Sequence, residues 1–169
     1  KVKSQKELSL ADTSAVRNLP PLPDTADELK ALSAAVNGDA KYIYLREAAT
    51  EKTVKNVDLS NSRIITFATH GLVAGDLKNA EPALVLTPPR IGTALDDGLL
   101  TSSEVAQLKL NADLVILSAC NTAAGDDSEG AEGLSGLAKA FFYAGSRALL
   151  VSHWPVVSDA AVKLTTGML

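Results

Sequence analysis

Three runs of apolar, mostly β-prone residues recur along the chain, at residues 64–68, 114–117 and 148–151. Each run is typical of a short strand with apolar side chains on both faces. Segments with helical spacing separate the runs, and strands that alternate with helices predict an α/β fold with a mainly parallel sheet flanked by helices. We expect 64–68 and 114–118 to be neighbours, with 148–152 beside the second of them.

Capping residues mark where the helices between these strands begin and end. The expected helices begin at Asp24, at Thr50, at the capping-box pattern Thr101-Ser102-Ser103-Glu104, at residue 131 and at Ser158. The first should close at Asn37-Gly38, the second near residue 56, the third near residue 108 and the fourth at Gly145. In the fourth helix we expect one buried face, made by Leu134, Leu137, Ala138 and Phe141.

The remaining segments are less regular. Residues 1–23 are predicted to be an irregular segment or linker, because the run Pro20-Pro21-Leu22-Pro23 forbids a helix there, and residues 24–169 to be the domain proper. Residues 42–46 have the pattern of a short strand. Between residues 83 and 100 we expect an excursion with a hairpin turning at Asp97-Gly98. The polar loop 121–130 is expected to be mobile until a substrate or partner binds.

Composition and charge narrow the possible functions. Hydrophobic residues make up 46% and aromatics 4%, which suits an interior of aliphatic side chains. The net charge of −4 argues against direct binding to nucleic acid or to an anionic membrane. One cysteine cannot form an internal disulfide, which favours a cytoplasmic setting, and two distant histidines with one cysteine give no reason to expect a metal or another cofactor.

Two candidate catalytic residues follow neighbouring predicted strands. His70 comes shortly after the first strand and Cys120 shortly after the second. Ligands of open α/β sheets bind beyond the carboxyl ends of the strands, and adjacent strands are about 5 Å apart, so an imidazole and a thiol could meet there. The imidazole would take the thiol proton, and the backbone N–H groups of Gly71 and Cys120 could form an oxyanion hole. Either residue alone is more often structural, and it is the pair at matched positions that favours catalysis.

These residues lie in blocks that resemble a known family. The run Ile64-Ile65-Thr66-Phe67-Ala68-Thr69-His70-Gly71 and the run Leu117-Ser118-Ala119-Cys120-Asn121-Thr122-Ala123 are similar to two blocks of CHAT domains. The stretches Asp97-Gly98-Leu99-Leu100-Thr101 and Val151-Ser152-His153-Trp154-Pro155-Val156 resemble two more. The resemblance implies a caspase-like fold, a bacterial cysteine peptidase with a His70–Cys120 dyad, a protein or peptide substrate, and an adjoining regulatory region, often of TPR type. The separation of 120 − 70 = 50 residues agrees with that of caspases.

Three further residues are candidates for substrate binding. In related peptidases the residue two positions before the cysteine lines the pocket for the side chain preceding the scissile bond, and Ser118 holds that place here. His153 could form a structural hydrogen bond or a wall of the cleft, and Trp154 could pack in the core or support a second substrate side chain. The resemblance also implies that strands are missing at both ends of the chain. Two other functions stay open: a catalytically silent interaction module, and a thiol hydrolase of a non-peptide acyl substrate.

Overall fold

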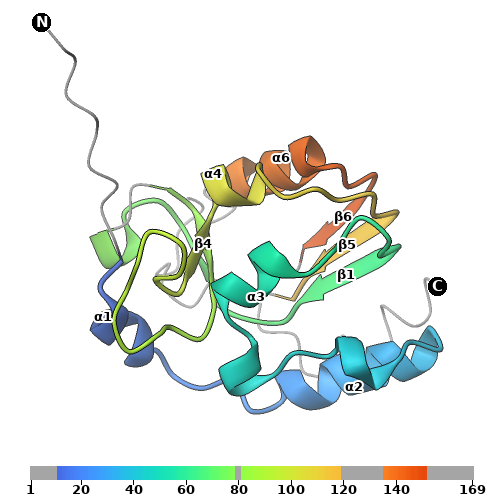
Figure 1. The fold of residues 1–169 in the computed structure, drawn as a ribbon, viewed down its shortest axis with the longest axis horizontal. Helices are drawn as coiled ribbons and strands as arrows, with labels where there is room; N and C mark the ends of the chain where they lie inside the picture. The colour runs from blue at the N-terminus through green and yellow to red at the C-terminus, as the bar shows by residue number, and fades with distance from the viewer. Residues whose placement is uncertain (1–10, 79–80, 119–134, 152–169) are drawn as a thin grey trace, which may run out of the picture.

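The main sheet is parallel and lies at the centre of the fold. The computed structural model describes residues 11–78, 81–118 and 135–151 (Figure 1). Its main strands, β1 (Ile64–Phe67), β5 (Leu114–Leu117) and β6 (Leu149–Val151), are arranged in the order β1-β5-β6. Both pairs are parallel, with Phe67 opposite Leu117 and Leu117 opposite Val151. The predicted fold class and strand neighbours are therefore confirmed.

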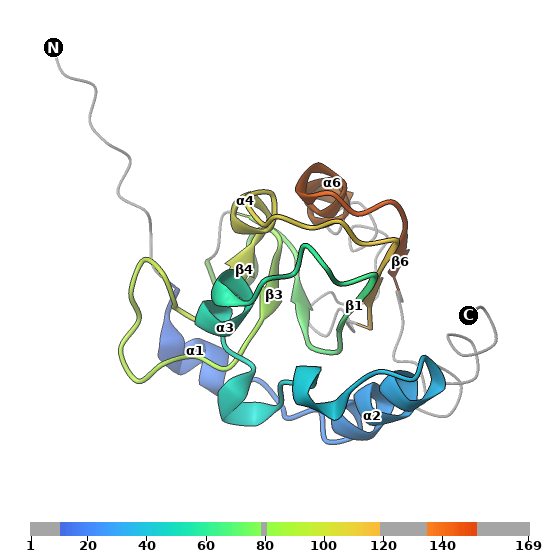
Figure 2. The same cartoon turned by 45° about the vertical axis from the view of Figure 1, so that its right-hand side comes forward.

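Helices cover the two faces of this sheet. α2 (Thr25–Ala35) lies on one side and α6 (Ser135–Ala144) on the other, as both Figure 1 and Figure 2 show. The central strand β5 is accordingly the most buried, and Val115, Ile116 and Leu117 are each at most 3% exposed. This two-sided burial explains why the strand is an unbroken apolar run rather than an alternating one.

α6 packs one apolar face onto the sheet. Its buried residues are Leu137, Ala140, Phe141 and Ala144, and the rings of Phe141 and Phe67 are 5.6 Å apart. Leu137 and Phe141 confirm the predicted face, whereas Ala138 is only half-buried. The helix ends at Gly145 as predicted: this residue has a φ of 112°, and a Cβ there would lie 2.3 Å from the carbonyl oxygen of Leu110. Residues 131–134, and with them Leu134, lie outside the described part of the chain.

A second, smaller sheet is antiparallel. It consists of β2 (Gly71–Leu72), β3 (Ala83–Val85) and β4 (Leu99–Thr101), in that order. The pairing of β3 with β4 confirms the predicted hairpin, but the tight turn lies at residues 93–96, just before the predicted Asp97-Gly98. β2 was not predicted because two residues carry too little pattern. A 3-10 helix, η3 (Asp76–Lys78), lies between β2 and β3.

The short helices follow the predicted caps in most cases. α3 (Glu51–Asn56) begins after Thr50, whose side chain accepts from the N–H of Thr53. α4 (Ser102–Val105) has the predicted capping box, but it is shorter than expected and ends before residue 108.

Two details of α2 concern its ends. Asp24 is at the N-cap position, but its side chain forms no capping hydrogen bond, since its backbone is already helical with φ −74° and ψ −18°. The predicted close at Asn37-Gly38 is confirmed, because Asn37 has a φ of 53° and the Gly38 N–H donates to Ser33 across 2.7 Å.

Two local predictions were wrong. Within the segment predicted to be irregular, Thr13–Arg17 form α1, which Asp12 caps by accepting from the N–H groups of Ser14 and Ala15. The expected strand at 42–46 is absent, and two 3-10 helices, η1 (Ala40–Tyr42) and η2 (Arg46–Ala48), flank that stretch instead. Tyr42 is 65% exposed, so the apolar side chains of this stretch are not buried in a sheet. The predicted loop 121–130 and the predicted helix after Ser158 fall outside the described residues, and the division at residue 23 stays a prediction.

Candidate functional site

His70 lies directly beyond the carboxyl end of β1 and is buried, with 5% of its surface exposed. Its backbone carbonyl accepts a hydrogen bond from the N–H of Val85 across 2.9 Å. Thr69, the residue before it, donates its side-chain hydroxyl to the carbonyl of the same Val85. The small antiparallel sheet therefore fixes the backbone on which the imidazole is carried.

The Nε2 atom of the His70 ring lies 2.7 Å from the carbonyl oxygen of Pro20. A carbonyl oxygen can only accept, so Nε2 carries the hydrogen of this bond. In the neutral ring the other nitrogen, Nδ1, is then the acceptor. This contact selects the tautomer in which Nδ1 can take a proton.

Pro20 is a site residue that the sequence analysis missed. It lies in the segment that was predicted to be a linker, between α1 and α2. Val16 of α1 is 3% exposed and packs against Leu72 and Val85 of the small sheet, which anchors this segment. The proline-rich run itself could have indicated this role. Prolines hold the backbone extended and lack the N–H groups that would form hydrogen bonds with neighbouring carbonyls, so those carbonyls stay available as acceptors.

Gly71 is buried in β2, opposite Leu84 of β3. Because the bond from Val85 N–H goes to the carbonyl of His70, the alternation of an antiparallel ladder puts Gly71 at a non-hydrogen-bonded position. The Gly71 N–H thus points away from β3. This orientation is what its predicted role as an oxyanion donor requires.

Ser118 continues the ladder of the main sheet by one residue, and its N–H donates to the carbonyl of Phe67 across 2.9 Å. It is half-buried, and its side chain forms a hydrogen bond with Glu28 of α2. Glu28 is itself only 8% exposed, and burial raises the pKa of its carboxyl, while the bond with Ser118 acts in the opposite direction. The sequence analysis also missed Glu28, although its position one helical turn before the buried Leu32 places it on the apolar face of α2.

The structure thus gathers His70, Gly71 and Ser118 around the carboxyl end of the paired β1 and β5. Cys120, His153 and Trp154 lie outside the described residues, so their positions stay predictions. Over residues 11–78, 81–118 and 135–151, no group of three His, Cys, Asp or Glu side chains is arranged to hold a metal ion.

A second buried polar cluster has a structural role. Glu51 is 1% exposed and accepts from the N–H groups of Asp97 and Gly98, at 2.8 and 3.2 Å. Lys55 forms ion pairs with Glu51 and, at 2.8 Å, with Glu104. These bonds join α3, α4 and the turn before β4, and they leave little acceptor capacity for a ligand.

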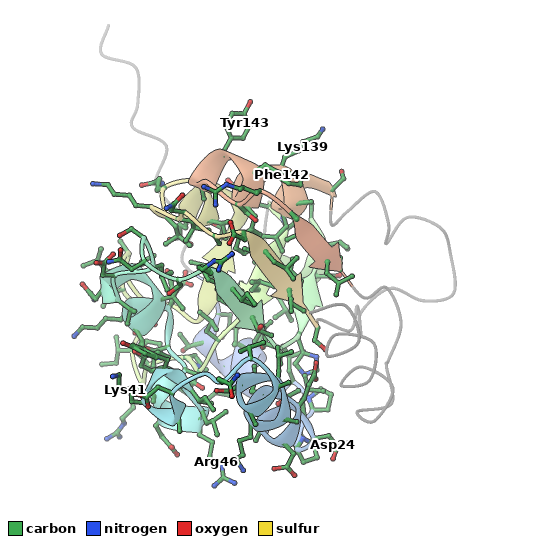
Figure 3. All side chains as sticks on the ribbon, turned by 90° about the vertical axis from the view of Figure 1, so that its right-hand side faces the viewer. Asp24, Lys41, Arg46, Lys139, Phe142 and Tyr143 are labelled. Carbon is green, nitrogen blue, oxygen red and sulfur yellow. The ribbon has the colours of Figure 1, made fainter. Side chains whose placement is uncertain are left out.

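The outer face of α6 carries exposed aromatic residues. Phe142 is 51% exposed and Tyr143 85%, and together with Lys139 they line a shallow pocket. Figure 3 shows this face on the opposite side of the molecule from Asp24 at the start of α2. None of the helices in the described parts of the chain has the length and apolar character needed to cross a bilayer.

Comparison with known proteins supplies the remaining finding. The family model described as CHAT domain matches residues 1–169. Neither a curated protein nor a solved structure gives a significant match. The family match spans the full sequence, and the parallel sheet with its flanking helices is consistent with a caspase-like fold. The chain therefore belongs to the CHAT domain family, a caspase-like family related to peptidases.

Proposed function

We propose that this chain is a cysteine endopeptidase domain in which Cys120 is the nucleophile and His70 the general base. The observation that carries the proposal is the register of the main sheet. Phe67 pairs with Leu117, and each proposed catalytic residue follows its strand by the same number of positions, 70 − 67 = 3 and 120 − 117 = 3. Adjacent strands are about 5 Å apart, so equal offsets favour a contact between imidazole and thiol.

The hydrogen bond to Pro20 supports the role of His70 as a base. With Nε2–H donating to that carbonyl, Nδ1 would accept the proton of the Cys120 thiol. The thiolate would attack the carbonyl carbon of the scissile bond, and the imidazolium would return its proton to the leaving amine. Water would then hydrolyse the acyl-enzyme, with the same imidazole as base.

The neighbouring residues would serve binding and transition-state stabilisation. The N–H groups of Gly71 and Cys120 would donate to the oxyanion of the tetrahedral intermediate. Ser118 would line the pocket for the side chain before the scissile bond, and His153 and Trp154 would contribute to the wall of the cleft. We further infer that a sensor region of TPR type, or a partner protein, controls activity through the loop 121–130. A shift of about 1 Å in the dyad can cost roughly 100-fold in rate, so a small change there would suffice.

Labelling with a peptidyl acyloxymethyl ketone tests the assignment. We expect the chain to form a covalent adduct at Cys120, Cys120→Ala to form none, and His70→Gln to react at least about 100-fold more slowly. The Cys120→Ala variant should stay folded, with a loss of about 1–2 kcal/mol at most. Labelling should also rise when a longer protein containing this domain meets its partner. Absence of any adduct under all conditions would favour the silent interaction module, and undiminished hydrolysis by Cys120→Ala would place the nucleophile elsewhere.

A further inference from the structure

Glu28 is a buried acid whose surroundings differ from those of the other buried acid, Glu51. The Glu51 carboxylate has two backbone N–H donors and the ammonium of Lys55. For Glu28 the hydrogen-bonding partner is a hydroxyl, that of Ser118. No lysine, arginine or histidine in the described parts of the chain forms an ion pair with it. A buried carboxylate that no cation neutralises costs free energy, so a basic group placed beside Glu28 would be favourable.

The position of Glu28 relates it to the proposed peptidase site. Its partner Ser118 directly follows β5 and precedes Cys120 by two residues. The contact between Pro20 and His70 holds the stretch that precedes α2 at the same end of the sheet. The carboxylate is therefore beside the residue that we expect to line the pocket for the substrate side chain before the scissile bond.

A purely structural role explains Glu28 less well. An acid in the first turn of α2 interacts favourably with the helix dipole, but Asp27 provides that charge without burial, since its side chain is 84% exposed. Burying the carboxylate adds nothing to the dipole interaction. It does produce a negative charge in a poorly hydrated position, where an incoming cation is bound more strongly than at the surface.

We propose that Glu28 is a specificity-determining residue that selects substrates with a basic side chain, arginine or lysine, immediately before the scissile bond. The inference rests on the proposed peptidase function and adds the substrate class. A guanidinium or ammonium group of the substrate would pair with the Glu28 carboxylate, and Ser118 would hold the carboxylate in place. Arginine is expected to be preferred over lysine, because its planar donors can pair with both carboxylate oxygens.

Peptides that differ only at the residue before the cut test this assignment. We expect arginine and lysine peptides to be cleaved with a kcat/KM on the order of 100-fold above a norleucine peptide. The isosteric variant Glu28→Gln should lose that preference, so that arginine, lysine and norleucine peptides are cleaved with similar kcat/KM. The matched control Asp27→Asn removes an acid one position away, on the exposed face of the same helix, and should leave the preference intact.

A binding measurement keeps the inference independent of turnover. Calorimetry should show that the chain binds agmatine, a free guanidinium ligand, but not the uncharged butylurea, and that Glu28→Gln loses agmatine binding. Equal cleavage of arginine and norleucine peptides, or a preference that survives Glu28→Gln, would overturn the role of Glu28. Adduct formation at Cys120 by a glycine-based acyloxymethyl ketone would show in that case that the peptidase assignment still stands. If neither cleavage nor adducts occur, the peptidase assignment fails. Agmatine binding that Glu28→Gln abolishes would then still show that Glu28 binds a basic group, and the absence of such binding would overturn that role as well.

Discussion

At the residue scale, Glu51 shows how strongly burial acts on a charged group in this protein. Burial raises the pKa of its carboxyl to about 7, although the hydrogen bond from Lys55 and the backbone donor at Asp97 favour the charged form. The folded protein therefore binds a proton at Glu51 more tightly than the unfolded chain, in which the usual value is 4.5. Linkage then makes the contribution of Glu51 to stability largest below pH 4.5 and progressively smaller as the pH rises through 7.

We predict that Glu51→Gln flattens the pH dependence of unfolding between pH 5 and 7. The wild-type protein should lose up to roughly 1.4 kcal/mol per pH unit in this range from Glu51, and an isosteric amide cannot titrate. Urea unfolding at several pH values measures the difference between the two proteins. The exposed Glu47→Gln is the control and should keep the wild-type slope. A Glu51→Gln slope equal to that of the wild type would show that Glu51 does not titrate in this window.

The site residues differ in how far the sequence reveals them. His70 and Gly71 could be proposed because each is unusual at the end of an apolar run. Pro20 and Glu28 could not be, because their roles depend on contacts with residues 50 and 90 positions away, 70 − 20 and 118 − 28. Local pattern carries no information on which distant side chain a carbonyl or carboxylate will meet.

At the scale of single elements, α6 has a packed face and an exposed face, and two consecutive phenylalanines lie on different faces. Phe141 is fully buried against the sheet, whereas its neighbour Phe142 is 51% exposed. The two share residue type, helix and backbone conformation, so they differ mainly in burial. They form a matched pair for measuring what this packing contributes.

We predict that Phe141→Ala lowers the free energy of unfolding by about 3–5 kcal/mol, because it opens a cavity against Phe67. Phe142→Ala should change it by about 0.5 kcal/mol or less, since no packed core is lost. Urea denaturation of both variants gives the comparison. Equal losses would mean that α6 does not bury the face described here.

Elements with a strong local signal were predicted correctly, and the two failures have different causes. The apolar runs of β1 and β5 and the capping residues of α3 and α4 specify their structures locally. Residues 42–46 have a strand-like pattern but pair with no strand in the described parts of the chain, and two 3-10 helices include the two ends of this stretch. α1 was not predicted because the prolines at 20, 21 and 23 indicate extended backbone, although Asp12 is an adequate cap for a helix before them.

At the scale of the whole molecule, the N-terminal segment is tied to the site while contributing little to the main core. The core between the main sheet and α6 contains no residue before Val54 among those the structure describes. Residues 11–23 instead contribute Val16 to the smaller core and Pro20 to the hydrogen bond with His70. Removing this segment should therefore leave the main sheet folded while disturbing the position of His70.

We predict that deleting residues 1–23 leaves the secondary structure of the main sheet in place but slows labelling of Cys120 by about 100-fold, because His70 loses the acceptor that orients it. Circular dichroism and the rate of adduct formation measure the two effects. A deletion of residues 1–10, which retains α1 and Pro20, is the control and should react like the intact chain. Unchanged labelling after the longer deletion would show that the Pro20 carbonyl is dispensable.

Pro20 and His70 are far apart in the sequence, and this separation affects how quickly the site around His70 can form after synthesis or refolding. The strands of the main sheet pair across 50 and 34 residues, 114 − 64 and 149 − 115, and contacts of such range form slowly because each closes a large loop. We expect the proline-rich segment to dock on His70 after both sheets have formed, since His70 follows β1 and Val16 is part of the core of the small sheet. Refolding followed by far-ultraviolet circular dichroism should therefore finish earlier than the recovery of thiol reactivity, so a newly made chain would pass through a folded but inert interval.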